Sequence, residues 1–177
     1  MPSVISGDAN VSATEFGFLD GVTSGLQSQI DSKLNLAGGK ILQIVRATDS
    51  TQRSTTSTTY VDVTGMSVTI TPQKSDSAVL VIATYFLDIS GGSPNDAALA
   101  ITDNSNNTLS GAQRAQHAIN AASGVSHSSV IIGYSTPATT SATTYKLRFR
   151  LINAGGQTAY VQNALHTGQM YAIEVSA

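Results

Sequence analysis

The sequence predicts an all-β protein, an antiparallel β-sandwich of the jelly-roll type with a short helical stem at its N-terminus. Composition is the first reason, because the 177 residues include 23 serines and 21 threonines but only two glutamates, Glu15 and Glu174. Threonine favours strands, whereas glutamate is common on exposed helix faces. The second reason is that short apolar runs alternate with turn residues from Lys40 onward, as in sandwiches and barrels. The third is that helical periodicity occurs only before residue 37.

Composition also excludes several classes of function. The chain has no cysteine and no tryptophan, so disulfide frameworks, thiolate metal sites and cysteine nucleophiles are excluded. The formal net charge is -2 and the pI is about 5.8, which provides no basic surplus to neutralise phosphates. No apolar run approaches the ~20 residues of a membrane span, and the N-terminus does not resemble a secretion signal. We therefore expect neither nucleic acid nor a membrane as a partner.

One amphipathic segment precedes the β body. Its apolar residues recur at steps of three and four, which places them on one stripe of an α-helix that ends at Ala37-Gly38-Gly39. The stripe consists of Leu19, Val22, Leu26, Ile30 and Leu34. A helix of about 12 to 15 residues is marginal alone in water, so the stripe requires a partner. Either the β body or a short coiled coil of identical chains would supply it. We expect a stem at residues 1–38 and a head at residues 39–177.

The head is predicted to contain eight to ten short strands. The expected ranges are 41–47, 60–63, 66–71, 78–89, 97–102, 108–116, 125–135, 144–152, 158–162 and 169–175. Within 144–152, Tyr145, Leu147, Phe149 and Leu151 alternate with charged residues and should face the core. The run 78–89 is apolar at both alternating positions. This indicates that one side of it packs on the second sheet and the other side on a neighbouring subunit.

The N-terminal segment resembles known virion proteins. Residues 11–34 are similar to a segment that recurs in bacteriophage tail fibres and related virion appendages. The motifs that carry this resemblance are Thr14-Glu15-Phe16, Leu19-Asp20-Gly21-Val22-Thr23-Ser24 and Leu26-Gln27-Ser28-Gln29-Ile30. Fibres often repeat the segment in tandem, whereas this chain has one copy, which favours a short stem over a long shaft.

The body resembles the C-terminal heads of many phage fibre proteins. The matching stretches are Gly39-Lys40-Ile41-Leu42-Gln43-Ile44-Val45, the Ser/Thr-rich residues 51–60, Thr69-Ile70-Thr71-Pro72 before Val79-Leu80-Val81, and Tyr171-Ala172-Ile173-Glu174-Val175. Such heads resemble the tumour-necrosis-factor and complement C1q fold and are trimers. Together with the stem, the resemblance covers nearly the whole chain.

The resemblance implies a non-enzymatic, homotrimeric structural protein on the surface of the virion, made in the host cytoplasm. The trimer stem would be held by the apolar stripe, and the N-terminal segment would bind other capsid or tail proteins. Contact of the head with the host surface is a further expectation. A complete gene product of this length would be a short head fibre or capsid decoration, and a fragment would be a fibre tip.

Enzymatic and metal-binding patterns do not fit the sequence. Residues 103–107 begin like a calcium loop, but Thr108 and Arg114 stand at its sixth and twelfth positions. Three isolated histidines remain, His117, His127 and His166. A threefold axis could gather three copies of one histidine, although ordinary loop or strand-edge positions are favoured. We therefore expect no catalytic residue, no cofactor and no metal.

A carbohydrate-binding tip of a tail fibre is the alternative hypothesis. Polar loops would offer amide and hydroxyl groups to a glycan of the host surface. The candidate residues are Ser93, Asn95, Asp96, Asn104, Asn106 and Asn107. Tyrosines could stack on sugar rings, but aromatic residues make up only 6% of the chain, which leaves few of them for this role.

Overall fold

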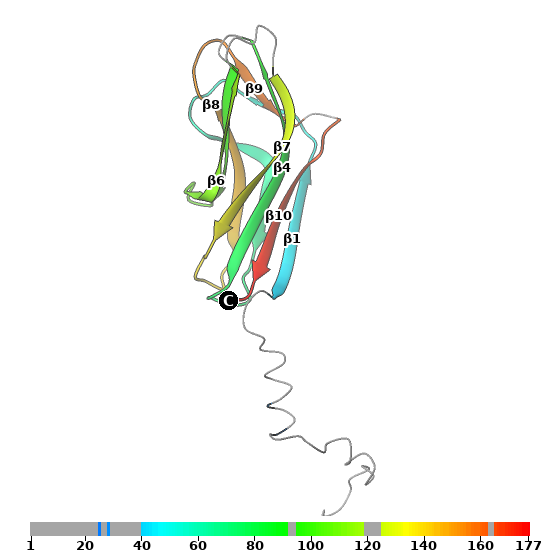
Figure 1. Ribbon diagram of the computed structural model, residues 1–177, viewed down its shortest axis with the longest axis vertical. Helices are drawn as coiled ribbons and strands as arrows, with labels where there is room; N and C mark the ends of the chain where they lie inside the picture. Colours follow the sequence, from blue (N-terminus) through cyan, green and yellow to red (C-terminus); the bar gives the residue numbers. More distant parts are fainter. Residues whose placement is uncertain (1–24, 26–27, 29–39, 92–94, 119–124, 163–164) are drawn as a thin grey trace, which may run out of the picture. The chain divides into compact units, whose positions relative to one another are not determined.

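The computed structural model describes residues 25, 28, 40–91, 95–118, 125–162 and 165–177 (Figure 1). The chain divides into two compact units, Met1–Ala37 and Gly38–Ala177. All five residues of the predicted stem stripe lie outside the described residues, so the stem stays a prediction. In the second unit the regular elements of the described residues are all strands, which confirms the all-β prediction for the head.

Ten strands are present in the described part of the second unit. In chain order they are β1 (Ile41–Asp49), β2 (Arg53–Thr55), β3 (Val61–Ile70), β4 (Ala78–Ser90), β5 (Asn95–Asp103), β6 (Thr108–Ala118), β7 (Val125–Ser135), β8 (Thr143–Leu151), β9 (Thr158–Val161) and β10 (Gly168–Val175). Apart from β2 and β3, their ends lie within two residues of the predicted ends.

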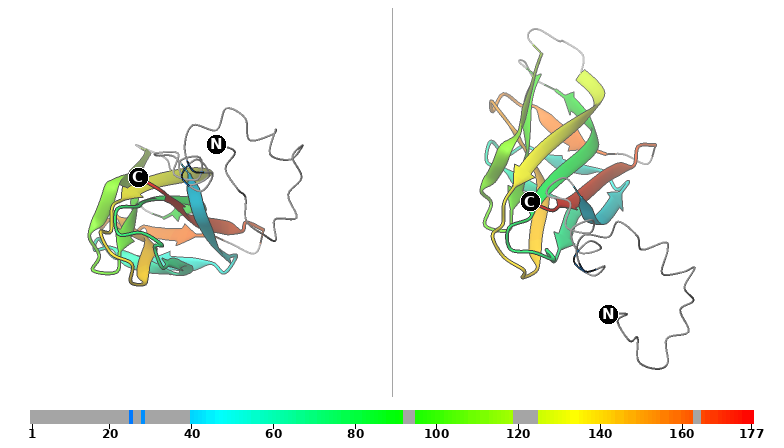
Figure 2. Two further views of the ribbon diagram at one scale, coloured as in Figure 1. Left: turned by 90° about the horizontal axis from the view of Figure 1, so that it is seen from below. Right: turned by 60° about the horizontal axis from the view of Figure 1, so that its bottom comes forward.

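The strands form two facing sheets with jelly-roll connectivity, joined by one bridge between β6 and β7 (Figures 1 and 2). Sheet A has the order β1-β10-β4-β7, with β9 pairing further along β4 and β2 pairing β9. Sheet B has the order β3-β8-β5-β6. The pairs β1 with β10, β3 with β8, β4 with β7 and β5 with β6 are all antiparallel. They are the pairs of one long hairpin folded over on itself, which is the jelly-roll arrangement.

The core lies between the sheets and takes alternate residues from each strand. On β8, the predicted core residues Tyr145, Leu147, Phe149 and Leu151 are at most 1% exposed, which confirms their inward orientation. β4 of the other sheet alternates in the same way, with every second residue buried along its whole length. This period of two follows from the pleat, because successive side chains of a strand point to opposite faces.

β3 is one strand where two short strands were predicted. Its pairing with β8 shifts between Asp62 and Ser67. Within this irregularity Gly65 has a φ of 94°, a left-handed conformation that residues with a Cβ adopt only under strain. Met66 and Val68, which follow the irregularity, are again buried in the core.

β2 was not predicted at all. It comprises three residues, Arg53–Thr55, and pairs only with β9 among the described strands. Such a short polar strand has no apolar alternation of its own, so it forms because β9 presents a free edge. Its existence is therefore decided by a partner about a hundred residues later in the chain.

Sheet A changes strands midway along β4. β10 pairs with β4 as far as Thr84, and β9 takes over from Leu87. Gln162 fills the interval: its backbone N–H donates to the Phe86 carbonyl at 3.0 Å, and its side-chain Oε1 accepts from the Phe86 N–H at 3.4 Å. The Gln162 side chain is fully buried. This arrangement places the residues before β10 over the outer side of β4.

Candidate interaction surface

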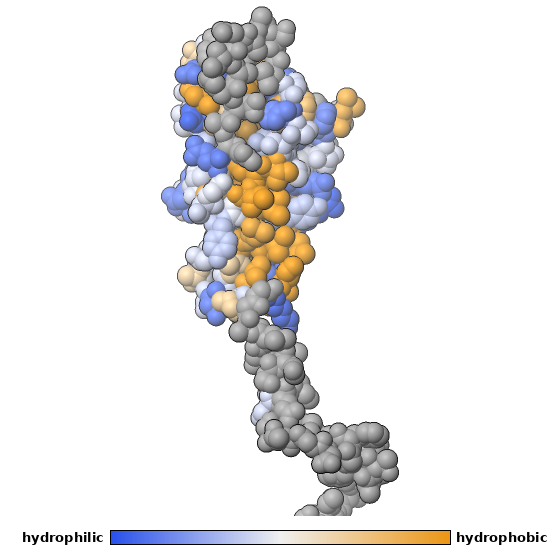
Figure 3. Space-filling view, viewed as in Figure 1, coloured by the Kyte–Doolittle hydropathy of each residue, from blue (hydrophilic) through white to orange (hydrophobic). Residues whose placement is uncertain are grey.

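The outer side of sheet A carries apolar side chains that a single chain leaves in contact with solvent. Ile44 of β1 is 56% exposed, and Val130, Ile132 and Tyr134 of β7 are 41%, 51% and 52% exposed. Partly buried neighbours on β4 and β10 complete the surface. We call this surface the apolar face, and it comprises Ile44, Leu80, Ile82, Phe86, Val130, Ile132, Tyr134, Tyr171 and Ile173. Figure 3 shows a hydrophobic band along the strands of sheet A.

Strand register aligns the apolar face into rows that cross the sheet. The first row is Ile44, Ile173, Leu80 and Tyr134, and the second row contains Tyr171, Ile82 and Ile132. Directly opposed residues on one side of antiparallel strands lie within contact distance of each other. The side chains therefore form one surface, and a contiguous exposed apolar surface marks a contact with another molecule.

The outer side of sheet B is charged. Asp62 of β3 accepts hydrogen bonds from the Arg148 Nε at 2.7 Å and the Lys146 Nζ at 3.2 Å, both on β8. The guanidinium of Arg150 lies over the Tyr60 ring, 5.1 Å from its centroid. Asp62, Lys146 and Arg148 thus pair with one another at the surface.

Small residues of β5 lie beside these charged side chains. Ala98 and Ala100 pair with Arg150 and Arg148 and are 1% and 0% exposed. Long side chains with a charged head cover apolar surface with their aliphatic stems. The outer side of sheet B is thus closed by the chain's own side chains, whereas the apolar face is not.

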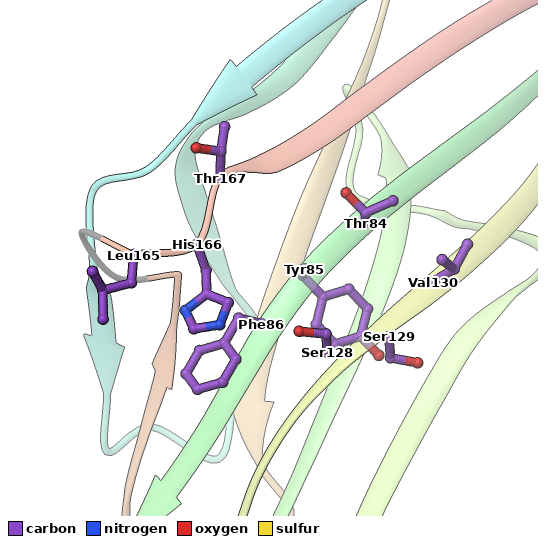
Figure 4. Close-up of a pocket in the computed structure, with 9 residues that line it drawn as sticks. All are labelled: Thr84, Tyr85, Phe86, Ser128, Ser129, Val130, Leu165, His166 and Thr167. Carbon is purple, nitrogen blue, oxygen red and sulfur yellow. The ribbon is translucent and has the colours of Figure 1, made fainter.

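A shallow depression of about 450 Å³ lies at one end of the apolar face (Figure 4). The His166 ring stacks on the Phe86 ring with centroids 4.1 Å apart and an angle of 13° between the planes. Thr84, Ser128 and Ser129, which carry hydroxyl groups, also line the depression. Among the described residues, the lining includes one imidazole, that of His166, and no carboxylate or lysine.

The tip of the β5–β6 hairpin uses its polar groups internally. The Asn107 N–H and Nδ2 donate to the two carboxylate oxygens of Asp103, each at 2.9 Å, and Asn106 Oδ1 accepts from the Lys146 Nζ at 2.7 Å. Burial acts to raise the pKa of Asp103, but the hydrogen bonds from Asn107 and Ser105 and the charge of Lys146 hold it below its ordinary value. Through this Asn-rich turn β6 returns antiparallel to β5.

The predicted receptor-loop residues are not brought together into one site. Asn104, Asn106 and Asn107 are exposed at the hairpin tip. Asp96 lies in β5, is 1% exposed and accepts from Asn153 Nδ2 at 2.5 Å, so its carboxylate is inside the protein and not on a receptor-facing loop. Asn95 begins β5, and Ser93 lies outside the described residues.

Glu174 is a buried carboxylate that the sequence pattern did not single out. It is 0% exposed and accepts from Gln43 Nε2 at 2.6 Å and from the backbone N–H groups of Gln73 at 2.8 Å and Lys74 at 3.3 Å. Burial acts to raise the pKa of Glu174, but these hydrogen bonds outweigh it and hold the pKa below its ordinary value. The carboxylate ties β10 and β1 to the turn that precedes β4, a structural role.

The three histidines belong to different elements. His117 is in β6, His127 is in β7 and His166 precedes β10. Among the residues that the structure describes, no three His, Asp or Glu side chains are grouped as a metal site would require. In that same part of the chain no helix has the length and hydropathy needed to cross a membrane.

No family model matches the chain, and no curated protein matches it by sequence. Solved structures with some similarity are the VP2 subviral particle of infectious bursal disease virus, at 15% identity and a TM-score of 0.33 over 75% of this chain and 39% of that chain, and the T13 viral particle of the same virus, at 16% identity and 0.33 over 76% and 36%. A structure of the Gx strain gives 15% identity and 0.33 over 78% and 41%. The chain spans about two fifths of the length of these chains, and likeness of this degree carries no argument about function.

Proposed function

We propose that this chain is a non-enzymatic structural protein of a virus particle, carried on the virion surface as a homotrimer that assembles through the apolar face of sheet A. The observation that carries the assembly is the exposed apolar face itself. The viral assignment is supported by the resemblance of residues 11–34 and of the body to phage fibre proteins. A jelly-roll body agrees with it, since this architecture is common in viral surface domains.

The energetics favour a trimer held by the head and the stem together. Fully burying a large apolar side chain contributes about 1.5 to 3 kcal/mol, so covering the four half-exposed residues of the apolar face contributes about 3 to 6 kcal/mol per subunit. Association costs about 4 to 15 kcal/mol. The free energy gained by covering the apolar face alone is therefore close to the smallest cost of association. A coiled coil formed by Leu19, Val22, Leu26, Ile30 and Leu34 would add the rest, because the linked heads raise its effective concentration.

The proposed division of roles follows from this. Residues 1–38 form the stem and bind other capsid or tail proteins, and residues 39–177 form the outward head. We favour this role over a sugar-binding tip because the side-chain amides of Asn106 and Asn107 at the β5–β6 hairpin already bond to Lys146 and Asp103. We therefore do not extend the proposal to a host glycan.

Light scattering of the purified full chain tests the assembly. We expect a single species with three times the 18.3 kDa mass of the chain at micromolar concentration. A monodisperse single chain under these conditions would overturn the proposal.

Gold-labelled antibodies against the head test the location. Intact particles of the virus that encodes the chain should be labelled on their surface. Particles that lack the chain, in both labelling and mass spectrometry, would overturn the virion assignment and leave the trimer as a separate result.

A further inference from the structure

The seam between β6 and β7 is open beside the apolar face. Among the described residues the two strands share one bridge, between Ser110 and Tyr134, although each strand is 11 residues long. At the bridge the strands lie close together, since a Cβ on Gly133 would come within 2.7 Å of the Ala112 Cβ. Gly111, next to Ser110, has a φ of 73°, and this left-handed residue redirects β6 beside the bridge.

The divergence of the two strands leaves a groove of about 300 Å³. Its lining residues are Gly111, Gln113, Val130, Ile131 and Ile132. Val130 and Ile132 also belong to the apolar face, so the groove is continuous with the proposed subunit interface. Ile131 is 1% exposed and packs in the core, so Val130 and Ile132 are the two aliphatic side chains of the wall that an aliphatic occupant can cover.

An aliphatic side chain is presented on the other side of β4. Leu165, in the connection between β9 and β10, is 90% exposed, the largest value among the exposed large hydrophobic residues of the described chain. His166, the next residue, is held by its stacking on Phe86. Figure 4 shows the Leu165 side chain directed away from the Phe86 ring. The strand order β1-β10-β4-β7-β6 puts this connection and the groove on opposite sides of β4.

We propose that Leu165 of each subunit inserts into the groove between β6 and β7 of the next subunit around the ring. The inference rests on the proposed function, because it requires a closed assembly of identical chains. A projecting side chain on one edge and a matching groove on the other edge make a heterologous contact, and such contacts close into a ring when the rotation between copies permits. The occupant is thus a second copy of this chain, and the contact fills the seam that the single chain leaves open.

Engineered disulfides test the contact directly, because the chain has no cysteine of its own. The double variant Leu165→Cys with Gln113→Cys should, on mild oxidation, give a covalent species of three chains in non-reducing denaturing electrophoresis that returns to one chain with a reductant. A second double variant, Leu165→Cys with Ile132→Cys, samples the other wall of the groove and should behave in the same way. The control is Leu165→Cys with Ser67→Cys, since Ser67 is exposed on β3 of sheet B and should remain a single chain.

Light scattering of the unmodified chain separates the two levels of proposal. If the chain is a trimer but neither groove pair cross-links above the control, the Leu165 contact is wrong and the proposed trimer stands. If Leu165→Cys alone forms a two-chain species, the loops face each other and the contact is equally wrong. A chain that is monomeric at micromolar concentration removes both proposals.

A substitution that is independent of thiol geometry gives a second measurement. Leu165→Asp would place a charge against Val130 and Ile132 of the next subunit, and we expect the trimer dissociation constant to rise at least about 10-fold. Leu165 is on the surface, so the fold should be retained, which circular dichroism checks. An unchanged dissociation constant would contradict the inserted position of this residue.

Discussion

Side chains alternate between the inner and outer side along the strands of both sheets, but the two outer sides carry different kinds of residue. On sheet B the outward positions of β8 hold Lys146, Arg148 and Arg150, and Asp62 of β3 pairs with two of them. On sheet A many outward positions of β4, β7 and β10 hold aliphatic or aromatic residues, among them Ile82, Ile132 and Ile173. An antiparallel sheet needs only one apolar side to fold. A second apolar side is therefore not required by the fold and points to assembly.

The comparison also separates surfaces that a single chain closes from surfaces that it leaves open. Arginine stems cover the small residues of β5, and the charged heads bond to Asp62 and to backbone carbonyls. On sheet A, Arg46 lies over the Tyr171 ring at 5.8 Å, but Ile132 and Tyr134 remain half exposed. One arginine at the margin does not close the apolar face, and this is where we propose that a second copy binds.

Making the apolar face resemble the outer side of sheet B should have the largest effect. Ile132→Asp would place one unpaired carboxylate per subunit in the interface, and burying such a charge is costly. We expect the trimer dissociation constant to rise at least about 1,000-fold, or about 4 kcal/mol, with the circular dichroism spectrum unchanged. Light scattering across a dilution series measures it.

The matched control is Ser67→Asp, which adds the same charge at an exposed strand position of sheet B. It should leave assembly unchanged. Trimers that persist in Ile132→Asp, or that dissociate equally in both variants, would show that the apolar face is not the interface.

The inner side of sheet A should be the next most sensitive. Glu174→Ala leaves the Gln43 amide and two backbone N–H groups without their acceptor, and we expect a loss of about 2 to 3 kcal/mol in the free energy of unfolding. Glu174→Gln keeps one acceptor oxygen and should lose less. Denaturant unfolding in the Ile132→Asp background measures the body apart from its assembly, and equal stability of the two Glu174 variants would contradict the role of this carboxylate.

The pH dependence of stability should follow the same residue. The pKa of Glu174 is lower in the folded chain than its ordinary value of 4.5, so the carboxylate contributes stability above that value and loses it as the pH falls through the folded pKa. We expect the unfolding free energy to decrease on acidification below about pH 4.5. The decrease should be shallower in Glu174→Gln, and identical slopes in the two proteins would assign the effect to other groups.

The charged side of sheet B should respond least. Asp62→Asn removes the partner of Arg148 and Lys146, but Asp62 is 46% exposed and surface ion pairs contribute about 0 to 1 kcal/mol. We expect a loss of about 0.5 kcal/mol and no change in trimer mass. A loss comparable to that of Glu174→Ala, or dissociation of the trimer, would remove the distinction between the two outer sides.

Local pattern was sufficient to predict much of the body. The alternation in β8 identified its four core residues, and the apolar run at 78–89 corresponds to β4, the strand at the centre of sheet A. The doubly apolar character of that run also pointed to contacts on both of its sides. Pattern alone did not identify Ile44, Tyr134 or Ile173 as parts of one surface, although the adjacent apolar residues at 130–132 and 171–173 are a signal that could have suggested it.

The last strand shows the limit of what the sequence alone determines. The sequence alone determined that Met170, Ala172 and Glu174 share one side of β10 and that Tyr171 and Ile173 share the other, because side-chain alternation is a local property of the backbone. Hydropathy favours the second side for the core, yet the structure buries the first. Only the tertiary structure decided this, because Gln43 and Gln73, 131 and 101 residues away, supply the hydrogen bonds that Glu174 needs inside the protein. Long-range pairing thus assigned the more apolar side of β10 to the outer surface, where a second copy is proposed to bind.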